Sequence, residues 1–261
     1  MHATSRSLQY LLAFDVGNSS VKCAARVNGS WGDLVRSPTA PTDTLADRLA
    51  GGLTDVLPAA AADARCLASS VHPAADRPLT QACERLGLRA PEFFGRDLTI
   101  PLPARVKEPE TVGCDRLLLA LGARAEVGAP CAVVSAGTAI TIDLVETDGT
   151  FAGGAIAPGF RLGAKALHEG TALLPFVEAE AAVAPPGKTT RDAVLAGVYW
   201  SCMGAVRCVL ERYRRDLERP DLPAALTGTD APRLREEMTG PCRHLPRLIY
   251  RGMAVALDRP R

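Results

Sequence analysis

Two similar stretches of the sequence decide the fold: LQYLLAFDVGNSSVKCAARVNG, residues 8–29, and CAVVSAGTAITIDLVETDG, residues 131–149. In each, an apolar strand runs into a turn of glycine and small polar residues. A second strand follows and ends at a hairpin dipeptide, Asn28-Gly29 or Asp148-Gly149. The turns align Gly17 with Gly137 and Asn18 with Thr138, and both hairpin dipeptides keep the same offset of 120 residues. The match predicts an internal duplication.

Strands and helices alternate along the rest of the chain, which favours an α/β fold. The predicted strands are Leu8–Phe14, Val21–Val27, Arg65–Val71, Cys131–Val134, Ile140–Val145 and a last strand Ala224–Thr227. The predicted helices are Thr42–Leu57 with a Thr42 cap, a helix around Leu79–Leu86, Leu117–Leu121, and Arg191–Leu217 with Thr189 or Thr190 as its cap. Residues Gly153–Gly159 are predicted to form a glycine- and proline-rich loop.

The size and composition are those of a globular protein that binds a small molecule. The chain has 261 residues, with 47% hydrophobic and 23% charged residues and a formal net charge of +1. This balance gives no electrostatic footprint for nucleic acid or an anionic membrane surface. The apolar run near the start is too short to span a bilayer, and the eight cysteines show no zinc-site spacing. We therefore expect a cytoplasmic protein that binds neither nucleic acid nor membrane.

The two glycine-containing turns are candidates for binding phosphate. Glycine allows close approach of the backbone, and main-chain N–H groups in such turns can point at phosphate oxygens. The first turn adds Asp15, a candidate ligand of Mg²⁺, and Lys22, a point charge for phosphate. One such turn alone can equally be a simple bend. Two at corresponding positions, facing each other across a cleft, predict a phosphate clamp.

Residues Gly113-Cys114-Asp115-Arg116 precede the apolar segment Leu117–Leu121. In one interpretation Asp115 only complements the helix dipole and Arg116 lies on the surface. Beside a nucleotide site, a carboxylate at a helix start can instead accept a hydroxyl proton, and the guanidinium can stabilise phosphoryl charge. The sequence contains no Walker loop, no G-x-G-x-x-G after a strand, no H-E-x-x-H and no G-x-S-x-G.

Five motifs, in order and spacing, resemble those of the type III pantothenate kinases. They are DVGNSSVK at 15–22, GCDR at 113–116, SAGTAITID at 135–143, GGAIAPG at 153–159 and TTRDAVLAG at 189–197. The resemblance implies a duplicated, ribonuclease H-like fold of the actin, acetate-kinase and sugar-kinase superfamily, with domains at residues 1–117 and 118–261. It also implies phosphorylation of pantothenate with ATP and Mg²⁺ as the first step towards coenzyme A, by a homodimer.

The resemblance assigns roles to individual residues. Asp115 would be the general base, and substrate binding would involve Gly113, Cys114, Asp115, Arg116 and Thr190. ATP binding would involve Asp15, Val16, Gly17, Asn18, Ser19, Ser20, Val21, Lys22 and Thr138.

Three positions depart from the family pattern. Ser135 stands where the family usually carries the Asp that binds an activating monovalent cation, K⁺ or NH₄⁺. Because a hydroxyl is a poorer ligand for a hard cation than a carboxylate, we predict weak or absent dependence on K⁺. Val106 replaces a frequent Tyr on the substrate side, which removes one hydrogen bond. Gly228-Thr229 replaces a Gly-Gly near the expected adenine position.

Two other functions fit the same residues. A diverged family member could bind ligand without turnover and act as a regulatory partner, which the changes at Ser135 and Val106 would favour. A kinase of the same superfamily could act on another small alcohol. Retention of Asp15, Asp115, Arg116 and Thr138 favours a working kinase. ADP release that depends on pantothenate would separate the three functions.

Overall fold

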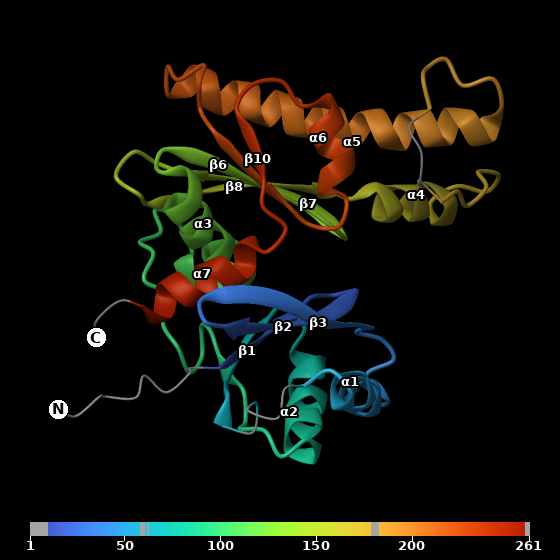
Figure 1. The fold of residues 1–261 in the computed structure, drawn as a ribbon. Helices are drawn as coiled ribbons and strands as arrows, with labels where there is room; N and C mark the ends of the chain where they lie inside the picture. Colours follow the sequence, from blue (N-terminus) through green and yellow to red (C-terminus); the bar gives the residue numbers. More distant parts are fainter. Residues whose placement is uncertain (1–9, 58–60, 62, 179–182, 259–261) are drawn as a thin grey trace. The chain divides into compact units, whose positions relative to one another are not determined.

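Two five-stranded mixed sheets organise the described part of the chain (Figure 1). This computed structural model describes residues 10–57, 61, 63–178 and 183–258. The strand order is β3-β2-β1-β4-β5 in the first sheet and β10-β9-β6-β7-β8 in the second. The chain divides into two units, each built on one sheet. Unit 1 comprises Met1–Pro101, Thr111–Gly122 and Ile249–Arg261, and unit 2 comprises Leu102–Glu110 and Ala123–Leu248.

The described residues of unit 1 form the first sheet and all or part of four α-helices. Its strands are β1 (Leu11–Val16), β2 (Ser20–Val27), β3 (Ser30–Pro38), β4 (Arg65–Ser70) and β5 (Glu92–Phe93). Its helices are α1 (Leu45–Thr54), α2 (Asp76–Arg85), the first turns of α3 (Cys114–Val127) and most of α7 (Leu248–Leu257). The strands β1, β2 and β3 form an antiparallel meander, whereas β4 pairs with β1 in parallel and β5 with β4 in parallel.

Unit 2 repeats this plan. Its strands are β6 (Cys131–Ala136), β7 (Ala139–Val145), β8 (Phe151–Pro158), β9 (Ala224–Thr227) and β10 (Cys242–His244). Its α-helices are α4 (Phe160–Glu169), α5 (Thr190–Asp216) and α6 (Ala231–Glu237), together with the end of α3. Here β6, β7 and β8 form the meander, while β9 pairs with β6 and β10 with β9 in parallel.

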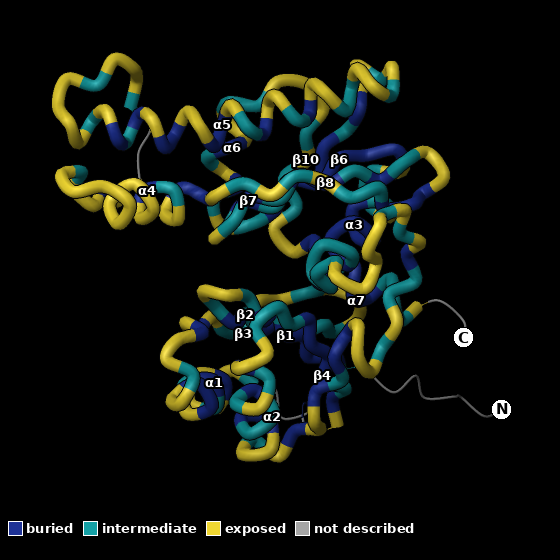
Figure 2. The backbone as a smooth tube through the Cα atoms, turned by 180° about the vertical axis from the view of Figure 1, so that it is seen from behind, coloured by how far each residue is buried: buried dark blue, intermediate teal, exposed yellow. Residues whose placement is uncertain are grey.

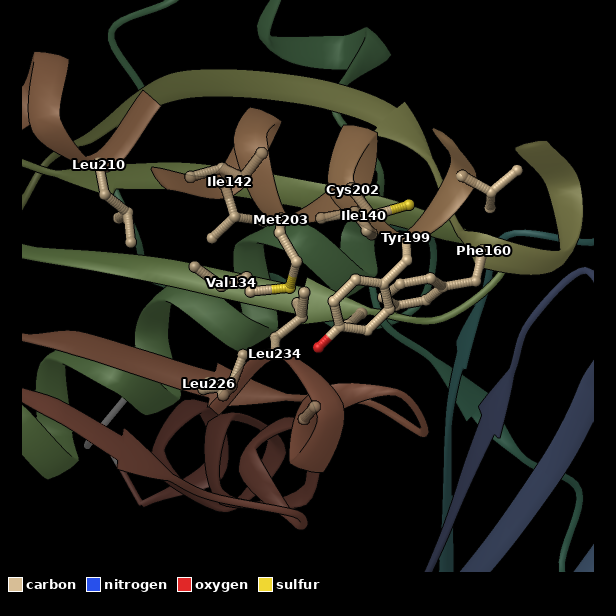
Figure 3. Close-up of a cluster of buried hydrophobic side chains, with 14 of the residues drawn as sticks. Val134, Ile140, Ile142, Phe160, Tyr199, Cys202, Met203, Leu210, Leu226 and Leu234 are labelled. Atoms are coloured by element: carbon tan, nitrogen blue, oxygen red, sulfur yellow. The ribbon is translucent and has the colours of Figure 1, made fainter. Parts of the chain in front are cut away.

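One face of each sheet is buried beneath helices. In unit 1, Phe14 and Val16 of β1 pack with Leu49 of α1 and Leu79 of α2. In unit 2, side chains of β6, β7 and β9 pack against α4, α5 and α6. Figure 3 shows this cluster, in which Val134, Ile140, Ile142 and Leu226 of the sheet meet Phe160, Tyr199, Cys202, Met203, Leu210 and Leu234 of the helices.

Polar residues occupy the opposite face at the end of each sheet where the glycine turn lies. Because side chains alternate along a strand, Asp15 points away from the face of Phe14 and Val16. The register places Lys22 and Ser69 directly beside Asp15. At this end of the first sheet, the core-facing side chains and the polar groups thus lie on opposite faces.

The predicted duplication is confirmed by the topology of the two sheets. The strands β1 and β6 begin 120 residues apart, and β3 and β8 both end in a proline, Pro38 and Pro158. The second glycine turn is one residue shorter, because Val16 pairs with Val21 whereas Ala136 pairs with Ile140. The expectation that the two turns face each other concerns separate units and stays a prediction.

The prediction of a loop over Gly153–Gly159 is wrong, because most of it lies in strand β8. Its pairing with β7 runs from Phe151 to Pro158 and includes a register shift between Asp143 and Val145. Gly153 has φ of +90°, a conformation that glycine adopts without strain. β8 is an edge strand, where proline and glycine are tolerated.

Several predicted boundaries also shift. The predicted strand Leu8–Phe14 starts outside the described residues, and β1 extends to Val16. The first helix begins at Leu45 after Thr44, so Thr42 is not its cap. Thr189 caps α5, since its side chain accepts a hydrogen bond from the N–H of Asp192. Ala224–Thr227 is a strand, but it is not the last one, because β10 follows.

The predicted domain division after residue 117 stays a prediction. Within unit 1, α7 packs directly on α3: a Cβ atom on Gly252 would lie 2.7 Å from the carbonyl carbon of Leu118. This contact explains why the C-terminal helix belongs with the N-terminal sheet.

By length and composition alone, α5 would suit a membrane span. Its apolar side chains Met203 and Val206 are fully buried in the core of unit 2, and this packing explains the apolar composition of the helix.

Candidate active site

The first glycine turn connects β1 to β2 and is held tightly by the backbone. The N–H of Gly17 donates to the carbonyl of Ser20 at 3.0 Å. Asn18 and Ser19 are exposed at the tip, whereas the side chains of Val16 and Val21 lie in the core. Of the predicted ATP-binding residues, these two valines can therefore contribute only their backbone groups.

Thr39 holds this turn in place through two hydrogen bonds. No sequence motif predicted this role. The Thr39 hydroxyl donates to the carbonyl of Gly17 at 2.7 Å, and its N–H donates to the carbonyl of Ser19 at 3.2 Å. The Thr39 residue is fully buried. Its neighbours in the sequence carry no motif, so only the hairpin register, which brings the end of β3 beside the turn, could have indicated its role.

Asp15 and Lys22 form an ion pair on the two strands that the turn connects. Lys22 Nζ lies 3.0 Å from Asp15 Oδ2, and the two residues are register partners on β1 and β2. The Asp15 side chain is 17% exposed and that of Lys22 is 37% exposed, so both can still reach a ligand. The pair places a carboxylate, which can bind Mg²⁺, beside an ammonium group, which can bind phosphate, at the same end of the sheet.

The Gly113–Arg116 motif forms the start of α3. The N–H of Arg116 donates to the Gly113 carbonyl at 3.1 Å and to Asp115 Oδ1 at 2.8 Å. A Cβ atom on Gly113 would lie 2.5 Å from Asp115 Oδ1. Glycine at 113 therefore leaves room for the position of the Asp115 carboxylate.

Ser69 joins this motif to the first turn within unit 1. Ser69 lies beside Asp15 in the register of β4 and β1, and its Oγ is 3.3 Å from Cys114 Sγ. Unit 1 thus brings together the two predicted motifs at residues 15–22 and 113–116, although almost a hundred residues separate them in the sequence.

The second glycine turn, in unit 2, is supported by backbone instead of a threonine. Gly159 occupies the position that corresponds to Thr39, and its N–H donates to the carbonyl of Thr138 at 3.0 Å. A Cβ atom on Gly159 would lie 2.7 Å from that carbonyl oxygen and closer still to the one of Gly137. Thr138, the predicted ATP contact, is exposed at the tip of this turn.

The Gly228-Thr229 turn lies against the second glycine turn. The N–H of Asp230 donates to the carbonyl of Ala136 at 3.1 Å. Gly228 has φ of +99°, and a Cβ atom there would lie 2.6 Å from the carbonyl carbon of Ala136. Unit 2 therefore groups the predicted adenine turn with the predicted second phosphate turn.

Ser135 lies in a row of hydroxyl side chains. It is the counterpart of Asp15 and pairs with Thr141 on β7 and with Thr227 on β9. Asp143, a carboxylate on the same strand as Thr141, pairs with Val133 and is fully buried. The residues that flank Ser135 in the sheet are thus neutral, in contrast to the Asp15–Lys22 pair.

Two predicted substrate-side positions lie in unit 2. Thr190 is the exposed first residue of α5. The side chain of Val106 packs toward β8, since its Cγ1 would lie 3.3 Å from a Cβ atom on Gly153. How either residue meets the Gly113–Arg116 motif of unit 1 stays a prediction.

Among the described residues, no group of three or more His, Cys, Asp or Glu side chains could by itself hold a metal ion. Mg²⁺ commonly binds proteins through one or two carboxylates and completes its shell with phosphate oxygens and water. A single carboxylate such as Asp15 fits that behaviour.

Comparison with solved structures identifies the fold. A Baf family protein from Campylobacter jejuni superposes with a TM-score of 0.60 at 18% identity, over 95% of this chain and 98% of that one. MreB5 of Spiroplasma citri matches with a TM-score of 0.52 at 11% identity, over 95% and 96% of the two chains. The predicted fold class is confirmed: the chain has a duplicated, actin-like α/β fold.

Sequence comparison then gives the family. Residues 11–212 match the family model of type III pantothenate kinase. The type III pantothenate kinase of Phenylobacterium zucineum is 32% identical over 247 residues, which cover 93% of this chain and 95% of that protein. The chain belongs to the type III pantothenate kinase family, as its five motifs predicted, and it is a kinase.

Proposed function

We propose that this protein transfers the γ-phosphoryl group of ATP to the primary hydroxyl of pantothenate, the first step of coenzyme A synthesis. One observation carries the proposal beyond family membership. The start of α3, with Asp115, is bonded through Cys114 and Ser69 to the strand end that carries Asp15. A candidate base and a candidate phosphate site thus share one hydrogen-bonded framework within unit 1, and phosphoryl transfer depends on such positioning.

In this proposal, Asp115 accepts the proton of the attacking hydroxyl while Arg116 stabilises charge on the transferred group. Gly113 and Cys114 contribute to the pantothenate site, and Thr190 supplies a further contact. The ATP phosphates bind the two turns through backbone N–H groups of residues 15–22, through Lys22 and through Thr138. Asp15 would hold Mg²⁺, which neutralises developing phosphate charge when bound.

The decisive experiment measures ADP formation with ATP, Mg²⁺ and pantothenate for the wild type and Asp115→Asn. We expect pantothenate-dependent turnover that falls by at least about 100-fold in the variant, because the general base is lost. Asp221→Asn, which removes an exposed carboxylate paired with Arg219, is the matched control and keeps full activity. ADP release with other small alcohols instead would identify a different kinase. ATP binding without turnover would favour the regulatory alternative.

A homodimer formed through unit 2 completes the proposal. Large apolar side chains are exposed on α4, on the segment after it and on α5: Leu162, Leu167, Leu173, Phe176 and Trp200. Leu173 is 91% exposed, and Figure 2 shows the exposed stretch around α4. The outer side of α5 carries small exposed residues, Gly197, Ser201 and Gly204, which permit close helix packing. Exposed apolar side chains gathered on neighbouring elements support an interaction site here.

Light scattering tests the dimer. The wild type should have about twice the 27.5 kDa chain mass, and Trp200→Glu should give the monomer mass because it places a charge in the apolar contact. Val56→Glu, at an exposed apolar residue of unit 1, is the control and should leave the dimer intact. A monomeric wild type, or a dimer that withstands Trp200→Glu, would refute this interface.

A further inference from the structure

The thiol of Cys114 is already engaged by β4. Cys114 Sγ lies 3.4 Å from the carbonyl oxygen of Ser70 and 3.3 Å from Ser69 Oγ. A thiol has a single S–H, which donates a hydrogen bond to the Ser70 carbonyl. The sulfur then accepts a hydrogen bond from the Ser69 hydroxyl. The result is a short chain of hydrogen bonds between the first residue of α3 and the last two residues of β4.

The surroundings of Cys114 keep its side chain on this inner side. Ser69 is 1% exposed, and a Cβ atom on Gly95 would lie 3.6 Å from Cys114 Cβ, so the Gly95 backbone forms another wall. Burial raises the pKa of the Cys114 thiol, which therefore stays protonated and remains a donor at neutral pH. The neutral Cys114 side chain points toward Ser69 and Ser70. Any contact of residue 114 with substrate would therefore be made by its backbone.

Ser69 also belongs to the framework of the phosphate turn. It lies beside Asp15 in the parallel register of β4 with β1, and the N–H of Val71 donates to the carbonyl of Val16 at 3.0 Å. The end of β4 is thus bonded on one side to the strand that carries Asp15 and on the other to the helix that carries Asp115. Displacement of the α3 start would move Asp115 relative to the phosphate turn.

We infer that Cys114 is a positioning residue: its thiol, held between Ser69 and Ser70, sets the first turn of α3 so that the Asp115 carboxylate is aligned with the phosphate turn of unit 1. The inference rests on the proposed kinase function. It assigns a separate task to each residue of the motif, with Cys114 acting through Asp115 instead of binding substrate through its side chain.

The test separates positioning from simple packing by comparing three substitutions of the pair. Cys114→Ala removes the thiol, Cys114→Ser keeps a small group that both donates and accepts, and Ser69→Ala removes the partner. We expect Cys114→Ala to lower kcat by about 10-fold to 100-fold, the range for a slightly misplaced catalytic group, with an unchanged KM for ATP. Cys114→Ser should recover most of kcat, because the hydrogen-bond chain can re-form.

Coupling between the two residues is the second measurement. If the thiol acts through Ser69, the double variant Ser69→Ala with Cys114→Ala loses no more kcat than the more severe single variant. Multiplicative losses would show independent action and overturn the inference. So would a Cys114→Ala enzyme whose kcat stays within about twofold of the wild type, or a Cys114→Ser enzyme that is no better than Cys114→Ala.

Cys131→Ala is the matched control for packing. Cys131 is also buried at the first residue of its element, but it begins β6 in unit 2. This control should lower the urea midpoint and leave kcat unchanged, whereas Cys114→Ala lowers kcat. If the wild type shows no pantothenate kinase activity, the proposed function fails before the role of Cys114 is measured, so the two failures are distinguishable.

Discussion

The carboxylate of Asp115 lies over the backbone of Gly113, with Oδ1 2.5 Å from the point that a Cβ atom on Gly113 would occupy. Any side chain at 113 therefore requires the carboxylate to move. The displaced atom is the end of a flexible side chain, so the backbone need not change. Glycine at position 113 is therefore needed for the position of the Asp115 carboxylate, and not for the stability of the fold.

Gly113→Ala should accordingly reduce activity while leaving stability intact. We expect kcat/KM for pantothenate to fall by at least about 10-fold, because the base is shifted from its place. The urea unfolding midpoint should match the wild type. Steady-state kinetics and urea denaturation of the same preparation check both parts.

Gly51→Ala is the control for adding a methyl group. Gly51 lies in α1 with open space around the corresponding Cβ position, so alanine should stabilise the helix by about 0.5–1 kcal/mol and leave kcat unchanged. A fully active Gly113→Ala enzyme would show that Asp115 does not need its observed position.

The two strand–turn–strand segments and the Asp115 motif could be predicted from the sequence, because each consists of consecutive residues. A continuous run of apolar residues marks β1 and β6, and glycine marks the turns. The sequence could not predict Thr39 or Ser69, whose roles arise from contacts with Gly17 and Cys114 across many residues. The loop predicted over Gly153–Gly159 was wrong for a different reason. Glycine and proline usually end strands, but an edge strand such as β8 accommodates them.

A second prediction concerns monovalent cations. Ser135 has neutral neighbours, Thr141 and Thr227, at the positions beside it in the sheet. Hydroxyl groups bind hard cations poorly compared with carboxylates, so activity should change by no more than about twofold between K⁺-free buffer and millimolar K⁺. A steep rise with K⁺ or NH₄⁺ in the wild type would contradict this. Ser135→Asp should introduce cation dependence, measured in the same assay.

A third prediction concerns the contact between α7 and α3. A Cβ atom on Gly252 would lie 2.7 Å from the carbonyl carbon of Leu118 and closer still to its oxygen, so alanine requires movement of backbone. Gly252→Ala should lower the free energy of unfolding by about 1–3 kcal/mol, as overpacking of a core does. Urea denaturation measures this, with Gly51→Ala as the helical control. An unchanged midpoint would mean that α7 does not pack on α3 as described.

The fourth prediction is a loss of stability in alkaline solution that depends on a buried thiol. Burial raises the pKa of Cys131 from 9.0 to about 12, with a partial opposing effect from the charge of Arg124. Because the folded state holds the proton more tightly, the contribution of this thiol to stability is complete below pH 9. It is lost progressively as the pH rises from 9 towards 12.

Between pH 8 and pH 10.5, ionisation of the unfolded thiol should cost the wild type about 2 kcal/mol that Cys131→Ala does not lose. The substitution itself destabilises the protein at pH 8, so the gap between the two proteins should narrow as the pH rises. Urea denaturation at both pH values measures the two gaps. Cys208→Ala, which removes an exposed cysteine, controls for loss of a thiol as such. A gap between wild type and Cys131→Ala that stays constant would mean that this thiol is accessible to hydroxide in the folded protein.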